Sequence, residues 1–171
     1  MRLVIDGYNV IGRIHSLRSY FPRDLERARK GLNELLRRFK KIKGHKITVV
    51  YDGPGGVWGR EESSKSSGIK EIFTSERDQA DDVIMRMARA DPRVLVVVTG
   101  DGRVAGVCRK AGAAVMSPGE LEDSIMQAVY DDQKGGDVQE KDVRAAANKK
   151  KGPSKRLTRK KRKEIRLKKK I

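Results

Sequence analysis

The 171-residue chain is poor in the residues that build disulfides and zinc sites, with a single cysteine, Cys108, and two histidines, His15 and His45. One cysteine cannot form an intramolecular disulfide, and no Cys/His cluster has zinc spacing. A long apolar run is also missing, because the apolar start over residues 1–12 contains Asp6, lacks a basic leader and is too short for a membrane span. These absences predict a soluble protein of the reducing cytoplasm with no membrane contact, in which Cys108 is a buried apolar group.

Positive charge is abundant but unevenly placed. The formal net charge is +17, and residues 148–171 hold 14 Lys and Arg against one Glu, which leaves +4 for residues 1–147. The length allows one well-buried domain with an appendage. We therefore expect a folded domain over residues 1–132, followed over residues 133–171 by a low-complexity linker and a Lys/Arg-rich tail that is disordered or becomes helical on binding.

Short β-branched runs alternate with helical patterns, which indicates βαβ units, an α/β fold and a mostly parallel central sheet. Strands are expected over residues 3–6, 47–52, 69–73, 94–99 and 113–116. Helices are expected over residues 22–42, 79–90 and 103–110, and a fourth begins at Ser117. There Ser117 and Glu120 form a capping box around Pro118, so their interpretation is structural. The glycine- and serine-rich residues 53–68 are expected to form a long loop.

Aspartates end three of the predicted strands. Asp6 ends the first and Asp52 the second, and Asp101 follows the fourth. Ligands of open parallel sheets bind beyond the carboxyl ends of the strands, where the strand order reverses. Asp81 and Asp82 begin the helix that leads to the fourth strand, so Asp6, Asp81 and Asp101 are expected to converge if the first and fourth strands are neighbours.

A cluster of carboxylates needs a compensating charge, which a bound cation can supply. Hard oxygen ligands select Mg²⁺ or Mn²⁺, and such an ion can activate water and neutralise charge on a phosphate. Each residue also has a structural alternative. Asp81 or Asp82 taken alone is typical of a helix N-terminus, where negative charge is favourable. Asp52 and Asp101 each precede a glycine, as in common turns. The amide of Asn9 can either orient a bound water or phosphate or cap local backbone.

Five segments, in order and spacing, resemble the YacP-like branch of the NYN domain family: LVIDGYN at 3–9, VVYDG at 49–53, IFT at 72–74, QADDVI at 79–84 and VTGD at 98–101. The resemblance covers about residues 2–130. It implies a three-layer α/β/α PIN-like domain and a metal-dependent endoribonuclease, which in the best-described branch acts on messenger RNA in association with the ribosome.

The resemblance also implies roles for single residues. On matching positions, Asp6, Asp81 and Asp101 are the catalytic metal ligands, with Asn9 beside them. Asp82 stands where the branch often has Glu, so it is a less certain ligand. The Lys/Arg-rich tail lies outside the family pattern as we interpret it.

The tail is expected to bind phosphates with little sequence preference, because it has 14 basic residues and no aromatic residue. Its alternative is a solvated extension. Trp58, Arg60 and Lys65 of the predicted loop are expected to contact single-stranded RNA, as is Arg103. The tail residues expected to contact RNA are Lys149, Lys150, Lys151, Lys155, Arg156, Arg159, Lys160, Lys161, Arg162 and Lys163.

Two other functions compete with the endoribonuclease. A non-catalytic RNA- or ribosome-binding protein could keep the fold and act through its tail, although intact carboxylates at the key positions argue against it. A structure-specific DNA nuclease is the third candidate, since related folds cut DNA flaps with a larger acidic cluster. The short acidic set and the small domain favour RNA.

Overall fold

A six-stranded sheet forms the centre of the protein. The computed structural model describes residues 1–53, 62–66, 68–75 and 78–135. The strands lie in the order β3-β4-β2-β1-β5-β6 and run over Arg2–Asp6 (β1), Lys46–Tyr51 (β2), Glu62–Ser66 (β3), Ile69–Phe73 (β4), Leu95–Val98 (β5) and Ala114–Met116 (β6). All neighbours pair in parallel except β3, which pairs antiparallel with β4 at the sheet edge.

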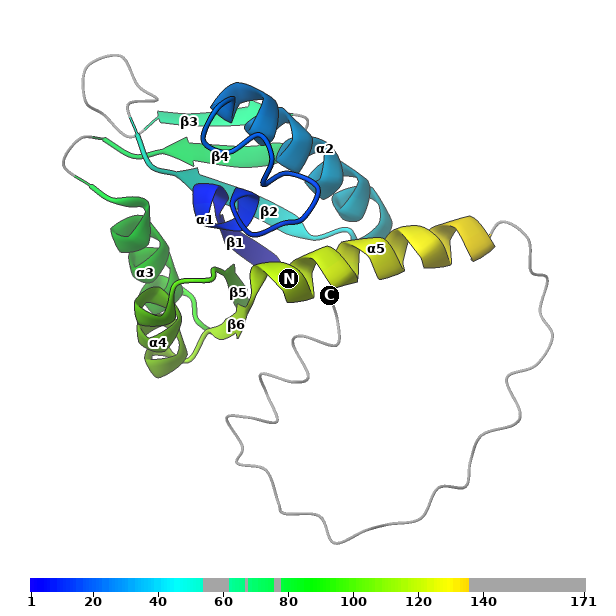
Figure 1. Cartoon of the computed structure of the whole chain (residues 1–171). Coiled ribbons are helices and arrows are strands. Elements are labelled where there is room, and N and C mark those ends of the chain that lie inside the picture. Colours follow the sequence, from blue (N-terminus) through cyan, green and yellow to red (C-terminus); the bar gives the residue numbers. More distant parts are fainter. Residues whose placement is uncertain (54–61, 67, 76–77, 136–171) are drawn as a thin grey trace, which may run out of the picture.

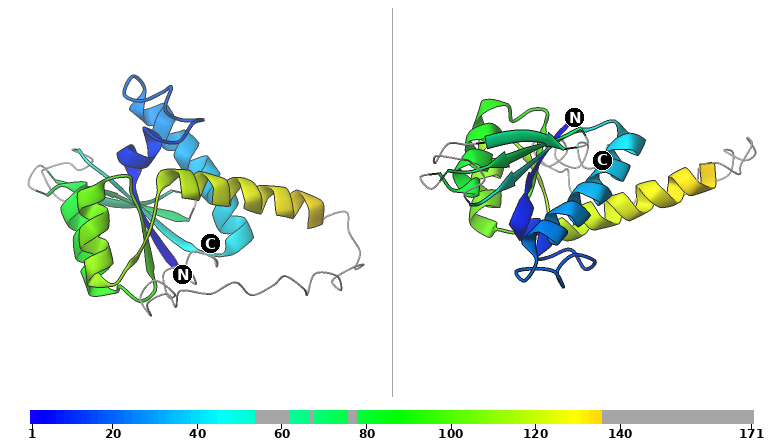
Figure 2. Two further views of the ribbon diagram at one scale, coloured as in Figure 1. Left: turned by 60° about the horizontal axis from the view of Figure 1, so that its bottom comes forward. Right: turned by 90° about the horizontal axis from the view of Figure 1, so that it is seen from above.

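Helices cover both faces of the sheet and complete a three-layer α/β/α domain, as predicted (Figure 1). The helices span Gly7–Ile11 (α1), Leu25–Lys43 (α2), Ala80–Ala90 (α3), Gly102–Ala111 (α4) and Pro118–Gly135 (α5). Helices α3 and α4 lie on one face, and α2 and α5 lie on the other, with α5 extending past the sheet (Figure 2). Within the described residues, none of the helices is both long and apolar enough to cross a membrane.

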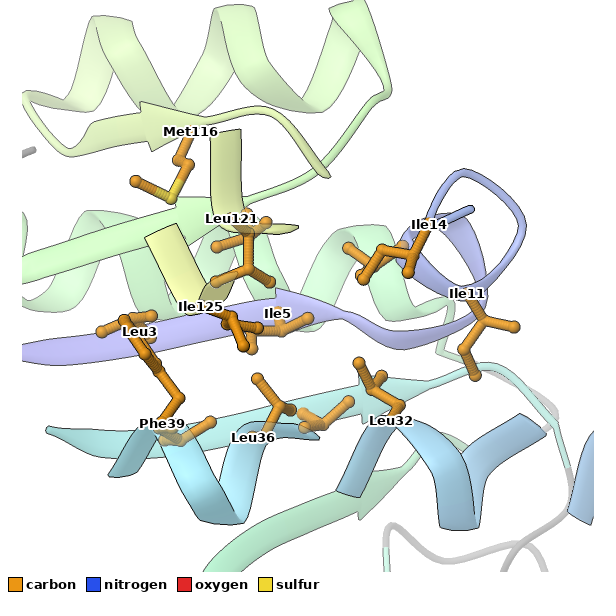
Figure 3. Close-up of a cluster of buried hydrophobic side chains, with 14 of the residues drawn as sticks. Leu3, Ile5, Ile11, Ile14, Leu32, Leu36, Phe39, Met116, Leu121 and Ile125 are labelled. Carbon is orange, nitrogen blue, oxygen red and sulfur yellow. The ribbon is translucent and has the colours of Figure 1, made fainter. Parts of the chain in front are cut away.

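The sheet is buried on both faces because alternate residues of each central strand pack into different cores. Leu3 and Ile5 of β1 pack with the apolar stripe of α2 and with Leu121 and Ile125 of α5, as Figure 3 shows. Val4, between them, faces the second core under α3 and α4. The helical periodicity predicted for α2 is thus confirmed by its buried residues, which are Ala28, Leu32, Leu36 and Phe39 among others.

Two small structural predictions are also confirmed. Ser117 N–H donates to Glu120 Oε2 at 2.7 Å, and Glu120 N–H donates to Ser117 Oγ at 3.2 Å, so both residues cap α5. Cys108 is fully buried in α4, and this burial raises the pKa of its thiol to about 11. It is therefore a packing residue in a protonated state.

Part of the predicted loop over residues 53–68 is a strand, so that prediction was wrong for residues 62–66. The segment Glu-Ser-Ser-Lys-Ser has no apolar or β-branched residue, and it becomes β3 through its backbone pairing with β4. Helix α1 was not predicted either, because its five residues are too short for a periodic pattern.

Candidate functional site

The site lies where the strand order reverses. Strand β1 has β2 on one side and β5 on the other, and the sheet continues from β2 to β4 in one direction and from β5 to β6 in the other. In the register of β1 and β5, Ile5 is opposite Val98, so Asp6 and Thr99 leave the sheet side by side. The predicted neighbours, the first and fourth expected strands, are therefore adjacent.

A pocket of about 550 Å³ opens at this edge of the sheet. Its lining brings together four carboxylates from four separate segments, one amide, one arginine and two aromatic rings. The lining residues are Asp6, Tyr8, Asn9, Gly12, Arg13, Phe21, Asp52, Asp81 and Asp101. Five of these nine were singled out from the sequence, whereas Asp82 is exposed on the first turn of α3 and does not line the pocket.

Asp6 is the buried carboxylate of the pocket, with 5% of its surface exposed. Burial raises its pKa from 3.8 to about 6, and the neighbouring carboxylates of Asp81 and Asp52 add to this rise. The hydroxyl of Thr99 opposes the rise by donating to Asp6 Oδ2 at 3.0 Å. The pocket therefore lacks enough positive charge to hold Asp6 fully ionised at mildly acidic pH.

Thr99 also links Asp6 to Asp101. The same hydroxyl oxygen accepts a hydrogen bond from the backbone N–H of Asp101 at 3.0 Å. Asp101 in turn is the N-cap of α4, where its Oδ1 accepts from Val104 N–H at 2.9 Å and this bond lowers the pKa of Asp101. Asp101 therefore has a structural role as the N-cap of a helix, in place of the Asp-Gly turn that was the alternative.

Asn9 also has a structural role, because its Oδ1 accepts the backbone N–H of Gly100 at 2.7 Å. This bond ties helix α1 to the loop between β5 and α4, which precedes Asp101. The capping alternative for Asn9 is therefore observed, with a partner 91 residues away in the sequence rather than local backbone.

Asp81 and Asp52 complete the acidic lining from the side of α3. Asp81 Oδ2 accepts from Arg103 Nη2 at 2.6 Å, in an ion pair at the pocket edge. Asp52 Oδ1 accepts the backbone N–H of Ala80 at 2.6 Å, and so caps α3 from the end of β2. Arg103, which was predicted to contact RNA, is thus paired with a pocket carboxylate.

The Asp-Gly-Tyr-Asn segment depends on its glycine. A Cβ on Gly7 would overlap the ring of Tyr51, which is fully buried beneath it. Tyr8 packs against Tyr51 with ring centroids 5.0 Å apart, and its hydroxyl accepts from Arg29 Nη1 at 2.7 Å. This close packing sets the position of α1 and thereby of Asn9.

Three residues of the site were missed by reasoning from the sequence. Arg13 and Phe21 lie in the irregular segment after α1, where no periodic pattern marks a direction. Thr99 was noted only as part of a strand, although Thr-Gly-Asp at a strand end is a signal for a hydroxyl beside a carboxylate. The other predicted RNA contacts, Trp58, Arg60 and the tail residues, lie outside the described residues, and Lys65 lies in β3.

The donor set fits a hard divalent cation in its chemistry. Carboxylate and amide oxygens surround one pocket, and the raised pKa of Asp6 indicates that a positive charge would be favourable there. Within the part of the chain that the structure describes, no three Asp, Glu, His or Cys side chains already form a coordination group. The residues therefore fit such an ion as a set of donors around a pocket, and not as a finished coordination shell.

Comparisons with known proteins agree with this architecture. A family model described as the YacP-like NYN domain matches residues 3–169, and so extends into the Lys/Arg-rich tail that we had placed outside the family pattern. The chain is 32% identical over 88 residues to the uncharacterized protein YacP of Bacillus subtilis (strain 168), covering 52% of this chain and 51% of that protein. The chain thus spans about half the length of that curated relative.

Two crystal structures of Rae1 (YacP) from Bacillus subtilis have a similar fold. One, of a mutant with a single tryptophan replaced by leucine, superposes with a TM-score of 0.66 at 23% identity, covering 84% of this chain and 87% of that chain. The second structure gives a TM-score of 0.64 at 26% identity, covering 80% and 79%.

Proposed function

Because the chain belongs to the YacP-like NYN domain family, which has the PIN-like nuclease fold, we propose that it is a metal-dependent endoribonuclease that hydrolyses phosphodiester bonds of RNA. One observation carries the proposal. Carboxylates from four separate segments, together with the amide of Asn9, line a single pocket at the switch point of the sheet. Solubility or helix capping alone does not require four such segments to meet.

In this proposal Asp6, Asp81 and Asp101 hold Mg²⁺ or Mn²⁺. When bound, the ion supplies activation of a water molecule and neutralises the negative charge that develops on the phosphate. Asp82 has no part in the set, because it lies outside the pocket. Asp52 lines the pocket with one oxygen committed to α3, and it supplies negative charge rather than a full ligand.

The remaining polar residues position these ligands. Thr99 fixes the side chain of Asp6 and the backbone of Asp101 through one hydroxyl group. Asn9 holds the loop that carries Asp101 at a set distance from α1. Arg103 forms an ion pair with Asp81, and this ion pair would have to break for Asp81 to bind a cation. Protonation of Asp6 near pH 6 weakens its hold on a cation, so activity should fall below that pH.

RNA is the proposed substrate, with messenger RNA and the ribosome as the proposed targets. The acidic set is small, which favours RNA over the DNA flaps cut by folds with larger clusters. The 14 basic residues after residue 147 give the chain a strong attraction to polyanions, and RNA is the abundant one in a cytoplasm. We place the protein in the reducing cytoplasm, where the buried thiol of Cys108 stays reduced.

The test is cleavage of end-labelled single-stranded RNA, and of ribosome-bound messenger, with Mn²⁺, with Mg²⁺ or with a chelator. Asp101→Asn is the informative variant, because asparagine also caps helices well and so leaves α4 intact while removing the charge. Asp123→Asn, exposed on α5, is the matched control. Cleavage that requires both the metal and Asp101 supports the proposal.

Two outcomes would contradict the proposed function. Salt-sensitive RNA binding without cleavage, in wild type and Asp101→Asn alike, would leave a non-catalytic RNA-binding protein. Metal-dependent cleavage of a DNA flap in preference to RNA would move the function to the structure-specific DNA nucleases. Asp82→Asn, tested in parallel, should cleave like wild type.

A further inference from the structure

One part of the pocket lining is not acidic. Of the residues that line the pocket in the described part of the chain, Arg13 is the single basic one. No ion pair of Arg13 is present among the described residues, in contrast to Arg103, whose guanidinium is paired with Asp81. Arg13 therefore brings a positive charge, which helps to lower the pKa of Asp101, to a pocket whose other charged residues repel phosphate.

The side chain of Arg13 has a defined position. It lies across Gly100, where an added Cβ would overlap the guanidinium and the adjoining Cδ of Arg13. Gly100 is the residue before Asp101 and is held by the amide of Asn9. The guanidinium is thus placed over the loop that carries a proposed metal ligand, within reach of a phosphate bound beside that ligand.

An aromatic row leads from the core to the same pocket. Tyr51 stacks on Phe73 at 5.3 Å between ring centroids, Tyr8 packs on Tyr51 at 5.0 Å, and Phe21 packs on Tyr8 at 6.1 Å. Tyr51 is fully buried, whereas Phe21 is 37% exposed and is one of the few exposed large apolar side chains among the described residues. The row therefore ends in a ring with free surface at the pocket.

Both residues are held on an anchored segment. Ile14 and Leu17, which follow Arg13, are buried in the core, and Figure 3 shows Ile14 pointing into it beside Ile11. Leu17 packs against α2 at Gly31, where a Cβ added to the glycine would overlap the leucine side chain. Because the segment is fixed at these points, Arg13 and Phe21 face the pocket without needing to be ordered on binding.

We propose that Arg13 and Phe21 form a nucleotide subsite of the pocket, in which Arg13 contacts a phosphate of single-stranded RNA and Phe21 stacks on the neighbouring base. A ring with one free face suits an unpaired base of any identity, and a guanidinium suits a phosphate. The subsite rests on the proposed function for the assignment of RNA as the bound strand. It adds a preference for unpaired over paired RNA.

The test measures binding to the full chain in the presence of a chelator, so that cleavage does not interfere. The two probes are a short single-stranded RNA and an abasic ribose-phosphate chain of equal length, both at raised salt, where contacts with the basic tail are screened. Phe21→Ala should weaken binding of the RNA by roughly 5- to 150-fold and leave the abasic chain unchanged, and Phe21→Trp should retain the preference for bases.

Arg13→Gln should weaken both probes and reduce the salt dependence of log affinity by about one unit of slope. The matched controls are Tyr130→Ala, a 51% exposed ring on α5, and Arg93→Gln, an exposed arginine before β5. Both controls should bind the two probes like wild type. Thermal unfolding of each variant checks that the fold is retained.

The subsite would be overturned by Phe21→Ala that keeps the preference for bases, or by Arg13→Gln with an unchanged salt slope. These results are separable from the proposed function. A wild type that cleaves RNA while both variants bind normally keeps the nuclease and removes the subsite. A wild type that never cleaves, but whose preference for bases needs Phe21, removes the nuclease and keeps the subsite.

Discussion

Asp6→Asn is expected to make the protein more stable at neutral pH while abolishing its proposed activity. Asp6 is buried at the carboxyl end of β1, and its pKa is raised to about 6 because burial disfavours the charged form. Asparagine has nearly the same shape and keeps an oxygen for the hydroxyl of Thr99. The substitution therefore removes an unfavourable charge without opening a cavity or leaving that hydroxyl unpaired.

The size of the effect follows from the two pKa values. The shift from 3.8 to about 6 corresponds to about 3 kcal/mol of unfavourable free energy once the carboxyl is ionised in the folded state. A raised pKa contributes stability that is complete below pH 3.8 and is lost as the pH rises through about 6. Relative to wild type, Asp6→Asn should gain up to about 3 kcal/mol above pH 7 and nearly nothing near pH 4.

Urea unfolding between pH 4 and pH 8, with a chelator present, measures this difference. Asp123→Asn on α5 is the control and should track wild type at every pH. Mn²⁺ at a thousand times its Kd should then reverse the order, because it stabilises only the protein with an intact ligand set, by about 4.1 kcal/mol. A gain of stability that does not change with pH, or a variant less stable than wild type at pH 8, would refute the reasoning.

Three further substitutions, one of them paired with a control variant, test the surroundings of the pocket. Gly7→Ala should lower the free energy of unfolding by about 1–3 kcal/mol, because its methyl group would overlap the ring of Tyr51. The control Gly106→Ala in α4, where nothing lies within 4 Å of the added Cβ, should raise the free energy of unfolding by about 0.5–1 kcal/mol. Urea unfolding compares the two variants. Thr99→Val should raise the pKa of Asp6 further, because it removes the hydroxyl that donates to Asp6 Oδ2; NMR titration measures this pKa. A pKa of Asp6 that stays near 6 would argue against the hydrogen bond. Arg103→Gln should increase the affinity for Mn²⁺ by up to about fivefold, because it releases Asp81 from its exposed ion pair. Calorimetry measures this affinity, and weaker binding would contradict the prediction.

Much of the fold could be predicted because its signals are local. Strands β1, β2, β5 and β6 are mainly apolar runs, β4 has apolar residues at both of its ends, and helix α2 has an apolar residue on every turn. Strand β3 could not be predicted, since its sequence is polar and the strand forms by backbone pairing with β4 at the edge of the sheet. Helix α1 could not be predicted either, because its five residues are too few for a periodic pattern.

The candidate site divides in the same way. The aspartates at the strand ends could be identified because parallel strands place their carboxyl ends at one edge. The hydrogen bonds of the site could not be predicted. The bond from Gly100 to Asn9 and the bond from Ala80 to Asp52 both join segments that are far apart in the sequence. Arg13 could not be identified because its direction depends on how the segment after α1 is anchored in the core.

The helix-capping bonds of Asp52 and Asp101 have a practical consequence for anyone who needs an inert form of this protein. Each of these residues serves the backbone of a neighbouring helix as well as the pocket, so removing either side chain with alanine changes the start of α3 or of α4 at the same time. Loss of activity in such a variant would then report damage to the scaffold and loss of a ligand together. Asp6→Asn, which keeps an oxygen for the hydroxyl of Thr99 and leaves the caps of α3 and α4 in place, is the better inactive form for trapping RNA complexes.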